Sequence, residues 1–145
     1  MIKLRNQLKS FWELNIGDGN PLPEYDSVSD HHYDKWGDVC LISQVVNEEY
    51  FDEGDQDQAH SKSLVILTAA KKVSKREHRE ISEEVELLIK KLYKFVKANR
   101  TFGTDWILNT EVQPRFLYGS HARDGTSYEY SQFKVTIKYR DSLSE

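Results

Sequence analysis

The chain has 145 residues, of which 38% are hydrophobic and 30% are charged, and its formal net charge is −4. This length predicts one domain, residues 1–145, that is large enough to bury a single core. No apolar stretch of about 18 residues is present and the first residues lack a long apolar segment, so we expect neither a membrane span nor a signal peptide. We therefore expect a soluble protein that is made in a cytoplasm and has no membrane partner.

Apolar residues at helical spacing open the chain and predict a short amphipathic helix over residues 2–14. These residues are Leu4, Leu8, Phe11 and Trp12. A cluster of Gly and Pro at residues 17–23 ends this helix. The segment 24–35 is polar, with Tyr25, Val28 and Tyr33 as its large residues, and we expect an irregular loop or an edge strand there.

Two apolar segments, 39–46 and 63–68, have the composition of strands that are covered on both faces. They are joined by a polar segment, so we expect them to pair as a long hairpin. Cys40, the single cysteine, lies inside the first of them and is expected to be buried. One cysteine excludes an internal disulfide and a cysteine-rich zinc site.

Six acidic side chains and no basic one stand between positions 48 and 57, a segment that we call the acidic run. They are Glu48, Glu49, Asp52, Glu53, Asp55 and Asp57. Their mutual repulsion excludes them from a core and predicts a projecting hairpin loop over residues 48–57. These six residues are the candidate interface or channel-lining residues of the chain. The alternative is a loop that is only solvated.

Charge divides the chain into two halves of opposite sign. Residues 1–60 carry 13 acidic and 4 basic side chains, whereas residues 61–145 carry 11 acidic and 16 basic ones. A subunit whose acidic loop reaches a basic face of a neighbouring copy needs such a division.

A long helix over residues 75–99 is predicted by a start motif and a helical period that agree. Ser74 and Glu77 form a capping box, in which each side chain can bond the other residue's backbone N–H. The apolar stripe behind it consists of Ile81, Val85, Leu88, Ile89, Leu92, Phe95 and Val96. Acidic residues occupy the first half of the helix and basic residues the second, which complements the helix dipole. The basic half thus has a structural explanation, and we do not take it as a nucleic-acid site.

Two further strands are predicted after Gly103. Residues 106–112 alternate apolar and polar, with Trp106, Leu108, Thr110 and Val112 on the apolar side, and residues 133–140 alternate strictly. Residues 118–125 contain Gly119 and Asp124-Gly125, which predict the turn of a second hairpin, and residues 141–145 predict a flexible tail. The order of elements predicts an α+β fold with one mixed, mainly antiparallel sheet packed against the long helix and the short first helix.

No group of residues has a spacing that only catalysis or metal binding explains, so we predict no catalytic residue, no metal site and no cofactor. The best metal candidate is His31 and His32 with Asp30 and Asp34, but adjacent side chains on a strand point to opposite faces. A calcium loop in 52–57 is too short and lacks the closing Glu.

Two other classes of function stay open. A small metal-dependent nuclease or hydrolase would use Glu111 with His31 or His32. A small binding module would line a pocket or peptide groove with Tyr118, Tyr128 and Tyr130, although tyrosines more often pack a sheet or a subunit contact.

The order of elements and several local patterns resemble the tail-terminator family of long-tailed bacteriophages, the minor tail proteins that cap the tail tube. The resemblance covers nearly the whole chain. It lies in the first helix from Ile2 to Leu14, the strand 39–46, the motif Asn47-Glu-Glu-Tyr50 before the acidic insertion, the returning strand 63–68, the long helix after Val73, and the ending Phe116-Leu-Tyr118, Arg123-Asp-Gly125 and Phe133 to Tyr139.

This resemblance implies a structural protein without enzymatic activity. It implies an α/β fold that assembles as a hexameric ring on the last ring of the tail-tube protein, stops tube polymerisation and presents a surface to the head-completion proteins of the neck. Genomic DNA would pass through the ring without sequence-specific binding, because an acidic channel wall repels phosphates. The protein would be found in the virion near the neck, and in the host cytoplasm during assembly. Another head–tail connector protein is the alternative within this class.

Overall fold

Six strands and two helices make up the part of the chain that the computed structural model describes, which is every residue except 1, 31–35, 52–57, 74–77, 124 and 143–145. In chain order the elements are α1 (Ile2–Asn15), β1 (Ser27–Ser29), β2 (Val39–Phe51), β3 (Gln58–Val73), α2 (His78–Ala98), β4 (Ile107–Val112), β5 (Leu117–Arg123) and β6 (Thr126–Ser142). The predicted α+β class and single domain are confirmed.

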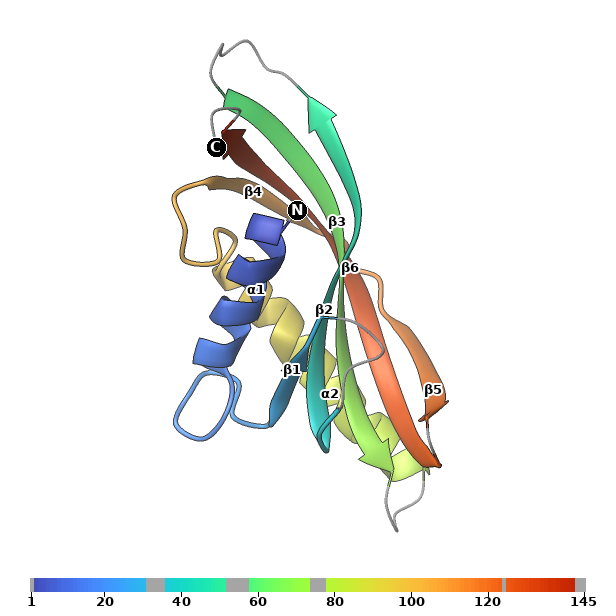
Figure 1. Cartoon of the computed structure of the whole chain (residues 1–145). Helices are drawn as coiled ribbons and strands as arrows, with labels where there is room; N and C mark the ends of the chain where they lie inside the picture. Colours follow the sequence, from blue (N-terminus) through green and yellow to red (C-terminus); the bar gives the residue numbers. More distant parts are fainter. Residues whose placement is uncertain (1, 31–35, 52–57, 74–77, 124, 143–145) are drawn as a thin grey trace.

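All six strands belong to one sheet with the order β1-β2-β3-β6-β4, and β5 pairs with β6 beside β4. The β1–β2 pair is parallel and every other pair is antiparallel, so the sheet is mixed and mainly antiparallel, as predicted. Both helices lie on the same side of this sheet (Figure 1). We call the side that the helices cover the helix face and the opposite side the open face.

The first helix confirms its prediction within one residue. Leu4, Leu8 and Trp12 are buried against the sheet, which is the stripe that the helical period indicated. The chain then turns at Gly17, whose φ of 88° is the left-handed conformation that favours glycine. The segment 24–35, for which a loop or an edge strand was expected, contains the short edge strand β1.

Tyr25 fastens the segment before β1 to the long helix. Its side chain is buried, and its hydroxyl donates a hydrogen bond to the backbone carbonyl oxygen of Leu88 over 3.1 Å. Burial raises the pKa of the Tyr25 hydroxyl well above its usual range, so this group stays a neutral donor. The bond joins two segments that lie on either side of the helix–sheet interface.

Replacing Tyr25 by phenylalanine is expected to lower the free energy of unfolding by about 1 kcal/mol, because one buried hydrogen bond is lost while the ring stays packed. Urea unfolding measures this change. The control is Tyr118→Phe, since Tyr118 is 50% exposed. Loss of the Tyr118 hydroxyl should change the free energy of unfolding by less than about 0.5 kcal/mol. Equal stability of wild type and Tyr25→Phe would contradict the assigned bond.

The predicted hairpin of two apolar strands is confirmed, but both strands are much longer than predicted. Residues Val39 to Phe51 pair with Lys71 to His60, with a bulge between Val45 and Asn47. The expected loop over 48–57 is therefore wrong at its start, because Glu48 and Glu49 lie in β2, opposite Ser63 and Lys62. Strand pairing continues past the apolar segment because backbone hydrogen bonds hold the ladder together whatever the side chains are.

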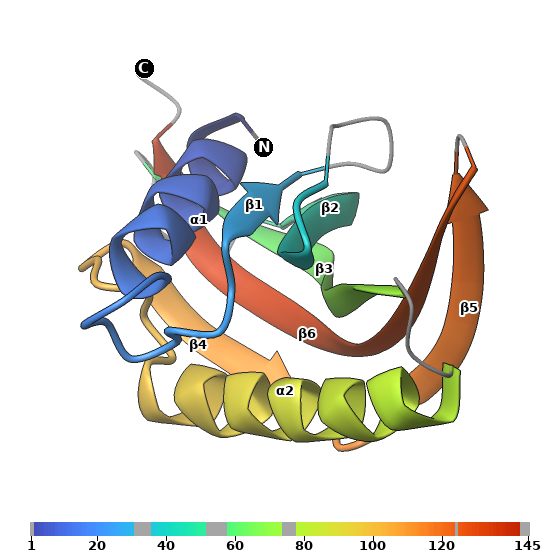
Figure 2. The same cartoon turned by 90° about the horizontal axis from the view of Figure 1, so that it is seen from below.

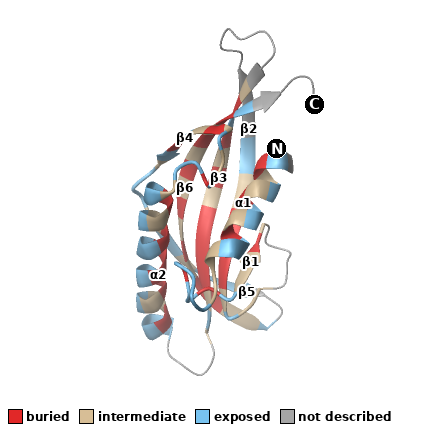
Figure 3. Ribbon diagram, turned by 90° about the vertical axis from the view of Figure 1, so that its left-hand side faces the viewer, coloured by how far each residue is buried: buried red, intermediate tan, exposed pale blue. Residues whose placement is uncertain are grey.

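The long helix α2 begins at His78 and ends at Ala98, inside the predicted range 75–99. The capping box of Ser74 and Glu77 lies outside the described residues. Six apolar residues of the predicted stripe are buried along one side of the helix, which faces the sheet (Figure 3). They are Ile81, Val85, Leu88, Ile89, Leu92 and Val96.

In β4 the buried positions differ in part from the predicted ones. A bulge between Ile107 and Asn109 shifts the register, so Ile107 is buried while Trp106 and Leu108 are partly exposed; beyond the bulge Thr110 is buried as predicted. The hydroxyl of Thr110 donates to the carbonyl oxygen of Arg100 over 2.5 Å, which satisfies this buried polar group.

The last strand, β6, is twice as long as the predicted strand over 133–140. It pairs with β3 along its whole length, from Ser127 opposite Val73 to Ser142 opposite Gln58. Its other edge pairs with β4 over one half and with β5 over the other.

Two predictions about the end of the chain are corrected by this pairing. Gly119 lies within β5, not in the turn, and Asp141 and Ser142 belong to β6, not to a tail, while 143–145 lie outside the described residues.

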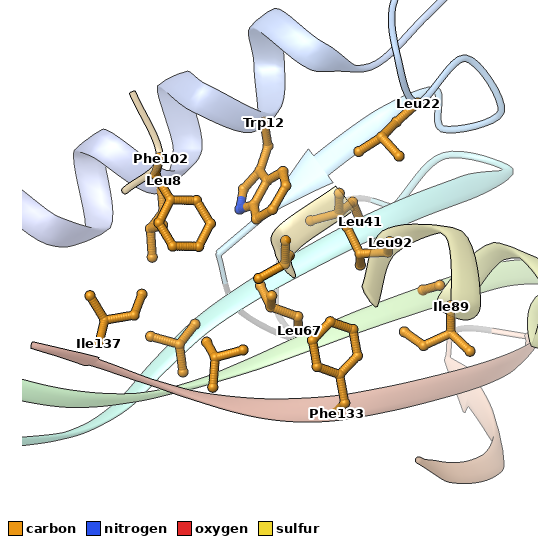
Figure 4. Packing of buried hydrophobic residues seen from close by; sticks show 14 of the residues in the cluster. Leu8, Trp12, Leu22, Leu41, Leu67, Ile89, Leu92, Phe102, Phe133 and Ile137 are labelled. Carbon is orange, nitrogen blue, oxygen red and sulfur yellow. The ribbon is translucent and has the colours of Figure 1, made fainter. Parts of the chain in front are cut away.

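The main core lies between the helix face of the sheet and the two helices (Figure 4). Trp12 and Leu8 of α1 approach Phe102 and Ile137, while Ile89 and Leu92 of α2 lie over Leu67 and Phe133. A second, smaller cluster lies on the open face and consists of Cys40, Ile42, Ala70 and Tyr128, with Trp36 and Tyr130 packed against it. The predicted burial of Cys40 is confirmed.

Candidate interaction surface

The six acidic residues of the acidic run fall at the end of the β2–β3 hairpin. Glu48 and Glu49 are in β2, and Asp52, Glu53, Asp55 and Asp57 lie between the end of β2 and the start of β3, outside the described residues. The described ends of β2 and β3, at Phe51 and Gln58, lie at the end of the sheet that is farthest from β5 (Figure 1).

Alternation along β6 separates the two faces of the sheet. Phe133, Val135, Ile137 and Tyr139 are buried in the main core on the helix face. The residues between them point to the open face, because successive side chains of a strand point to opposite sides. Among the described residues, no helix covers this open face.

Basic residues occupy much of the open face near the acidic end of the hairpin. They are Lys62 of β3 and Lys134, Lys138 and Arg140 of β6. Leu64 and Ile66 of β3 lie between them and are only partly buried, opposite Thr136 and Lys134. A sheet face that combines partly exposed aliphatic side chains with lysines is suited to contact an acidic protein surface.

A pocket of about 360 Å³ lies at the other end of the open face. It is lined by Trp36, Thr68, His121, Tyr130 and Gln132, which come from β3, β5, β6 and the segment before β2. Figure 2 shows how β6 curves at this end and carries β5 upward, on the side opposite to α2. We call this site the aromatic pocket, since three of its five lining side chains are rings.

The rings of the aromatic pocket are held by contacts with one another. The Trp36 ring lies 5.0 Å from the Tyr128 ring in a T-shaped arrangement and 5.6 Å from the His121 ring, measured between centroids. The Tyr128 hydroxyl donates to the Trp36 carbonyl oxygen over 3.4 Å. These contacts fix the segment before β2 against β6, so the pocket walls are preformed.

Gly119 makes room for one wall of the pocket. A Cβ atom at this position would lie 2.6 Å from the hydroxyl oxygen of Tyr130, which is closer than real contacts allow. Only glycine lets the Tyr130 ring lie against the β5 backbone. The predicted role of Gly119 in a turn is thus replaced by a role in pocket shape.

The three tyrosines of the binding-module hypothesis separate in the structure. Tyr130 lines the aromatic pocket and Tyr128 lies in the cluster beneath it, whereas Tyr118 alternates to the helix-face side of β5 and is exposed. Sequence reasoning missed Trp36 and His121, because the former lies in a polar segment and the latter in a predicted turn. The long β6–β3 pairing brings them together.

A polar cluster also joins α2 to the sheet. The buried Glu129 carboxylate lies 2.6 Å from Nδ1 of His78 and accepts a 2.7 Å hydrogen bond from the Ser120 hydroxyl. Both partners bond the same carboxylate oxygen, so this Ser, His and Glu do not form the serine–histidine–acid chain of a nucleophile. The cluster anchors the start of α2 to β5 and β6.

Basic residues of α2 form a second positive surface, on the outside of the molecule. Lys90 donates to Glu86 over 2.9 Å, and this hydrogen bond raises the pKa of the exposed Lys90. Lys91 donates to Glu24 over 2.7 Å. Desolvation is the largest single effect on the pKa of Glu24 and acts to raise it, but the hydrogen bond from Lys91, a backbone hydrogen bond and the charge of Lys91 together lower this pKa overall. These two bases of α2 have acidic partners in the same chain.

Metal-ligating side chains do not gather in the described part of the chain, which contains no group of three or more His, Cys, Asp or Glu that could hold an ion. Glu111, the candidate nuclease residue, is exposed on β4. His31, His32 and Asp34 lie outside the described residues, so the metal hypothesis based on them stays a hypothesis. Neither described helix is long and apolar enough to cross a membrane.

No protein-family model matches the sequence, and no curated protein matches it.

Proposed function

We propose that this protein is a structural tail-terminator protein of a long-tailed bacteriophage. In this proposal it forms a hexameric ring that caps the tail tube, stops tube polymerisation and joins the tube to the head-completion proteins. It acts in the virion near the neck after assembly in the host cytoplasm, has no enzymatic activity, and lets genomic DNA pass without sequence-specific binding. The resemblance in element order and in the closing strands motivates this choice.

The observation that carries the proposal is the open face of the sheet, which carries Lys62, Lys134, Lys138 and Arg140 around Leu64 and Ile66. The sequence supplies the complementary charge, because the acidic run spans the end of β2 and the segment that joins it to β3. Two copies can therefore meet through different surfaces, with the acidic run of one against the open face of the next.

Such a contact is heterologous, because each copy uses one surface as donor and another as acceptor. Heterologous contacts produce rings when the rotation between copies closes and filaments when it does not. A ring that ends a tube needs this geometry, since its capping effect comes from matching the tube on one side and failing to template another tube ring.

Native mass spectrometry at micromolar concentration, together with electron microscopy, tests the proposal. The expected result is a ring with a central hole that binds the ends of purified tail tubes. A strict monomer that forms no ring even with tail tubes would overturn it. Rings that bind only head-side proteins would identify another connector protein instead.

Reversing the last four charges of the acidic run, as Asp52→Lys, Glu53→Lys, Asp55→Lys and Asp57→Lys, is expected to abolish ring formation, because like charges then face each other. The matched control reverses four exposed acids elsewhere, Glu13, Asp18, Glu83 and Asp105, and changes the net charge by the same amount. The control should still form rings. If both variants assemble and cap tails equally, the acidic run is only solvated.

A further inference from the structure

Two strand edges of the sheet have no neighbouring strand in the described part of the chain. The strand β1 pairs with β2 only at Cys40 to Ile42, so from residue 43 onward β2 has a strand on one side alone, which is β3. On the other side of the sheet, β5 pairs only with β6. Such edges present backbone N–H and C=O groups that can pair with a strand of another chain. We call residues 43–47 the β2 edge and residues 117–122 the β5 edge.

The edge of β4 differs from these two because it already has a partner. The Thr110 carbonyl oxygen accepts a hydrogen bond from the Arg100 side chain over 3.4 Å, and the Thr110 hydroxyl donates to the Arg100 carbonyl oxygen. The segment after α2 therefore lies against β4. The β2 edge and the β5 edge are left as the places where a further strand fits.

Large apolar side chains are exposed on both of these edges. Five such side chains are exposed among the described residues, and three of them lie here, namely Val46 on the β2 edge and Leu117 and Tyr118 on the β5 edge. Neither edge contains Lys, Arg, Asp, Glu or Pro, with which natural edge strands prevent pairing. Exposed apolar residues on an uncharged edge indicate a contact with another protein chain.

The two edges match in strand direction. The strands β2 and β6 run the same way, because each is antiparallel to β3, and β5 is antiparallel to β6. Hence β5 is antiparallel to β2, and it stays so when a second copy continues the sheet sideways. The β5 edge of one copy and the β2 edge of the next fit an antiparallel ladder, which is heterologous because it joins different edges.

The backbone groups of the β2 edge point outward at residues whose side chains lie on the helix face. The Lys72 N–H bonds the Asp38 carbonyl oxygen, so every second residue counted from Asp38 bonds β3. The outward groups before the β2 bulge therefore belong to Ser43 and Val45. Val45 packs against the main core, which places both side chains on the helix face.

The β5 edge has the same relation between backbone and side chains. Continuing the alternation across β3 and β6 shows that the outward groups of β5 belong to Tyr118, Ser120 and Ala122. The Ser120 hydroxyl bonds Glu129, the residue that contacts the start of α2, so these side chains lie on the helix face as well. Pairing of the two edges thus keeps the helices of both copies on the same side of one continuous sheet.

We infer that the β5 edge of one copy pairs with the β2 edge of the next copy, so that the sheets of neighbouring subunits join edge to edge. This inference rests on the proposed ring function and names the strands that join its subunits. The register with the largest overlap sets residues 43–47 against residues 122–118 and places Gln44 opposite His121. Leu117, Tyr118 and Val46 are then covered by the contact.

The antiparallel order also agrees with the charges. In the sequence β2 continues into the acidic run, and the ladder directs this continuation past Leu117 of the neighbouring copy. Arg115 and Lys134 line a pocket of about 260 Å³ together with Leu117. The basic side chains therefore stand at the end of the β5 edge toward which the acidic sequence runs.

Two cysteine variants that are mixed before assembly test the contact directly. One carries Gln44→Cys and the other carries His121→Cys, both with Cys40→Ala, which removes the single natural thiol. Opposite residues of an antiparallel ladder have the Cα separation that a disulfide needs. Oxidation is expected to join the two different chains, which a tag on one of them identifies. The control pair replaces Gln44→Cys by Leu14→Cys, an exposed site on α1.

A disulfide within one chain does not interfere with this test. His121 is opposite Tyr128, which is opposite Lys72, whereas Gln44 is opposite Ile66. Lys72 and Ile66 are six positions apart on β3, which is about 20 Å along the strand. Each variant oxidised alone shows whether two copies of the same edge pair with each other.

A proline on the β5 edge provides an independent measurement. Ala122→Pro removes an outward N–H that β6 does not use, so the fold should be kept, as circular dichroism can verify. The concentration needed for ring assembly should rise at least about tenfold, because the proline cannot donate to the incoming strand and its ring occupies the space beside it. The control Ala122→Ser keeps the N–H and should assemble as the wild type does.

The outcomes separate the inference from the function. Rings together with the mixed cross-link and the Ala122→Pro effect support both. Rings without a mixed cross-link above the Leu14→Cys control, or with equal assembly of Ala122→Pro and Ala122→Ser, overturn the edge pairing and leave the ring intact. Cross-links of one variant with itself identify pairing of like edges and overturn the inference. A monomer under all conditions overturns the proposed function and the inference with it.

Discussion

Replacing Ile137 by lysine is expected to unfold the protein. Ile137 is fully buried in the main core on the helix face of β6. An ammonium group there would lose its hydration without gaining a partner, which costs several kcal/mol per ion. Total stabilities of small domains are about 5–15 kcal/mol, so this change removes much or all of the margin. Circular dichroism and urea unfolding at 25 °C measure the loss.

The adjacent substitution Thr136→Lys is the matched control. Thr136 precedes Ile137 on the same strand and points to the open face, where Lys134 and Lys138 already stand. The same new charge is solvated there, and we expect a change in unfolding free energy of less than about 1 kcal/mol. Equal destabilisation by the two lysines would contradict the assignment of helix face and open face, and with it the candidate interaction surface.

Replacing Trp12 by alanine is expected to lower the free energy of unfolding by about 3–5 kcal/mol, the usual cost of removing a large aromatic residue from a core. The Trp12 side chain is fully buried. Its ring lies 5.3 Å from the Phe11 ring, 5.7 Å from the Phe102 ring and 6.2 Å from the Phe95 ring, centroid to centroid. Removing the Trp12 ring therefore leaves a cavity where α1, α2 and the segment after α2 meet.

Leu14→Ala controls for a change of helix propensity in α1. Leu14 is 75% exposed, so its truncation should change stability by less than about 0.5 kcal/mol. The midpoint of urea unfolding should drop strongly for Trp12→Ala and stay near the wild-type value for Leu14→Ala. A small effect of Trp12→Ala would mean that α1 contributes little to the core.

The periodic pattern of apolar residues predicted those elements that bury one regular stripe of side chains. The helical period of Leu4, Leu8 and Trp12 and the strict alternation of Phe133 to Tyr139 both follow from burial against one surface. These elements confirm their predictions because the local period and the tertiary environment demand the same residues. The α+β class follows from their order.

Strand length was not predictable from apolar composition. Glu48, Glu49, Asp141 and Ser142 are polar, yet they lie in strands because a neighbouring strand satisfies their backbone groups. The β4 bulge moved burial from Trp106 and Leu108 to Ile107, whereas Thr110 is buried as the alternation predicted. Such shifts depend on the partner strand, which a local pattern does not contain.

The acidic run and the aromatic pocket differ in how far the sequence alone determines them. The acidic run is one continuous segment, so charge repulsion alone identifies it as a surface feature and the sequence by itself determines its composition and sign. The aromatic pocket combines Trp36, Thr68, His121 and Gln132 from distant parts of the chain, beside a glycine that admits Tyr130. Only the tertiary structure decided this site, because its side chains meet through the pairing of β6 with β3 and β5 and through the curvature of β6.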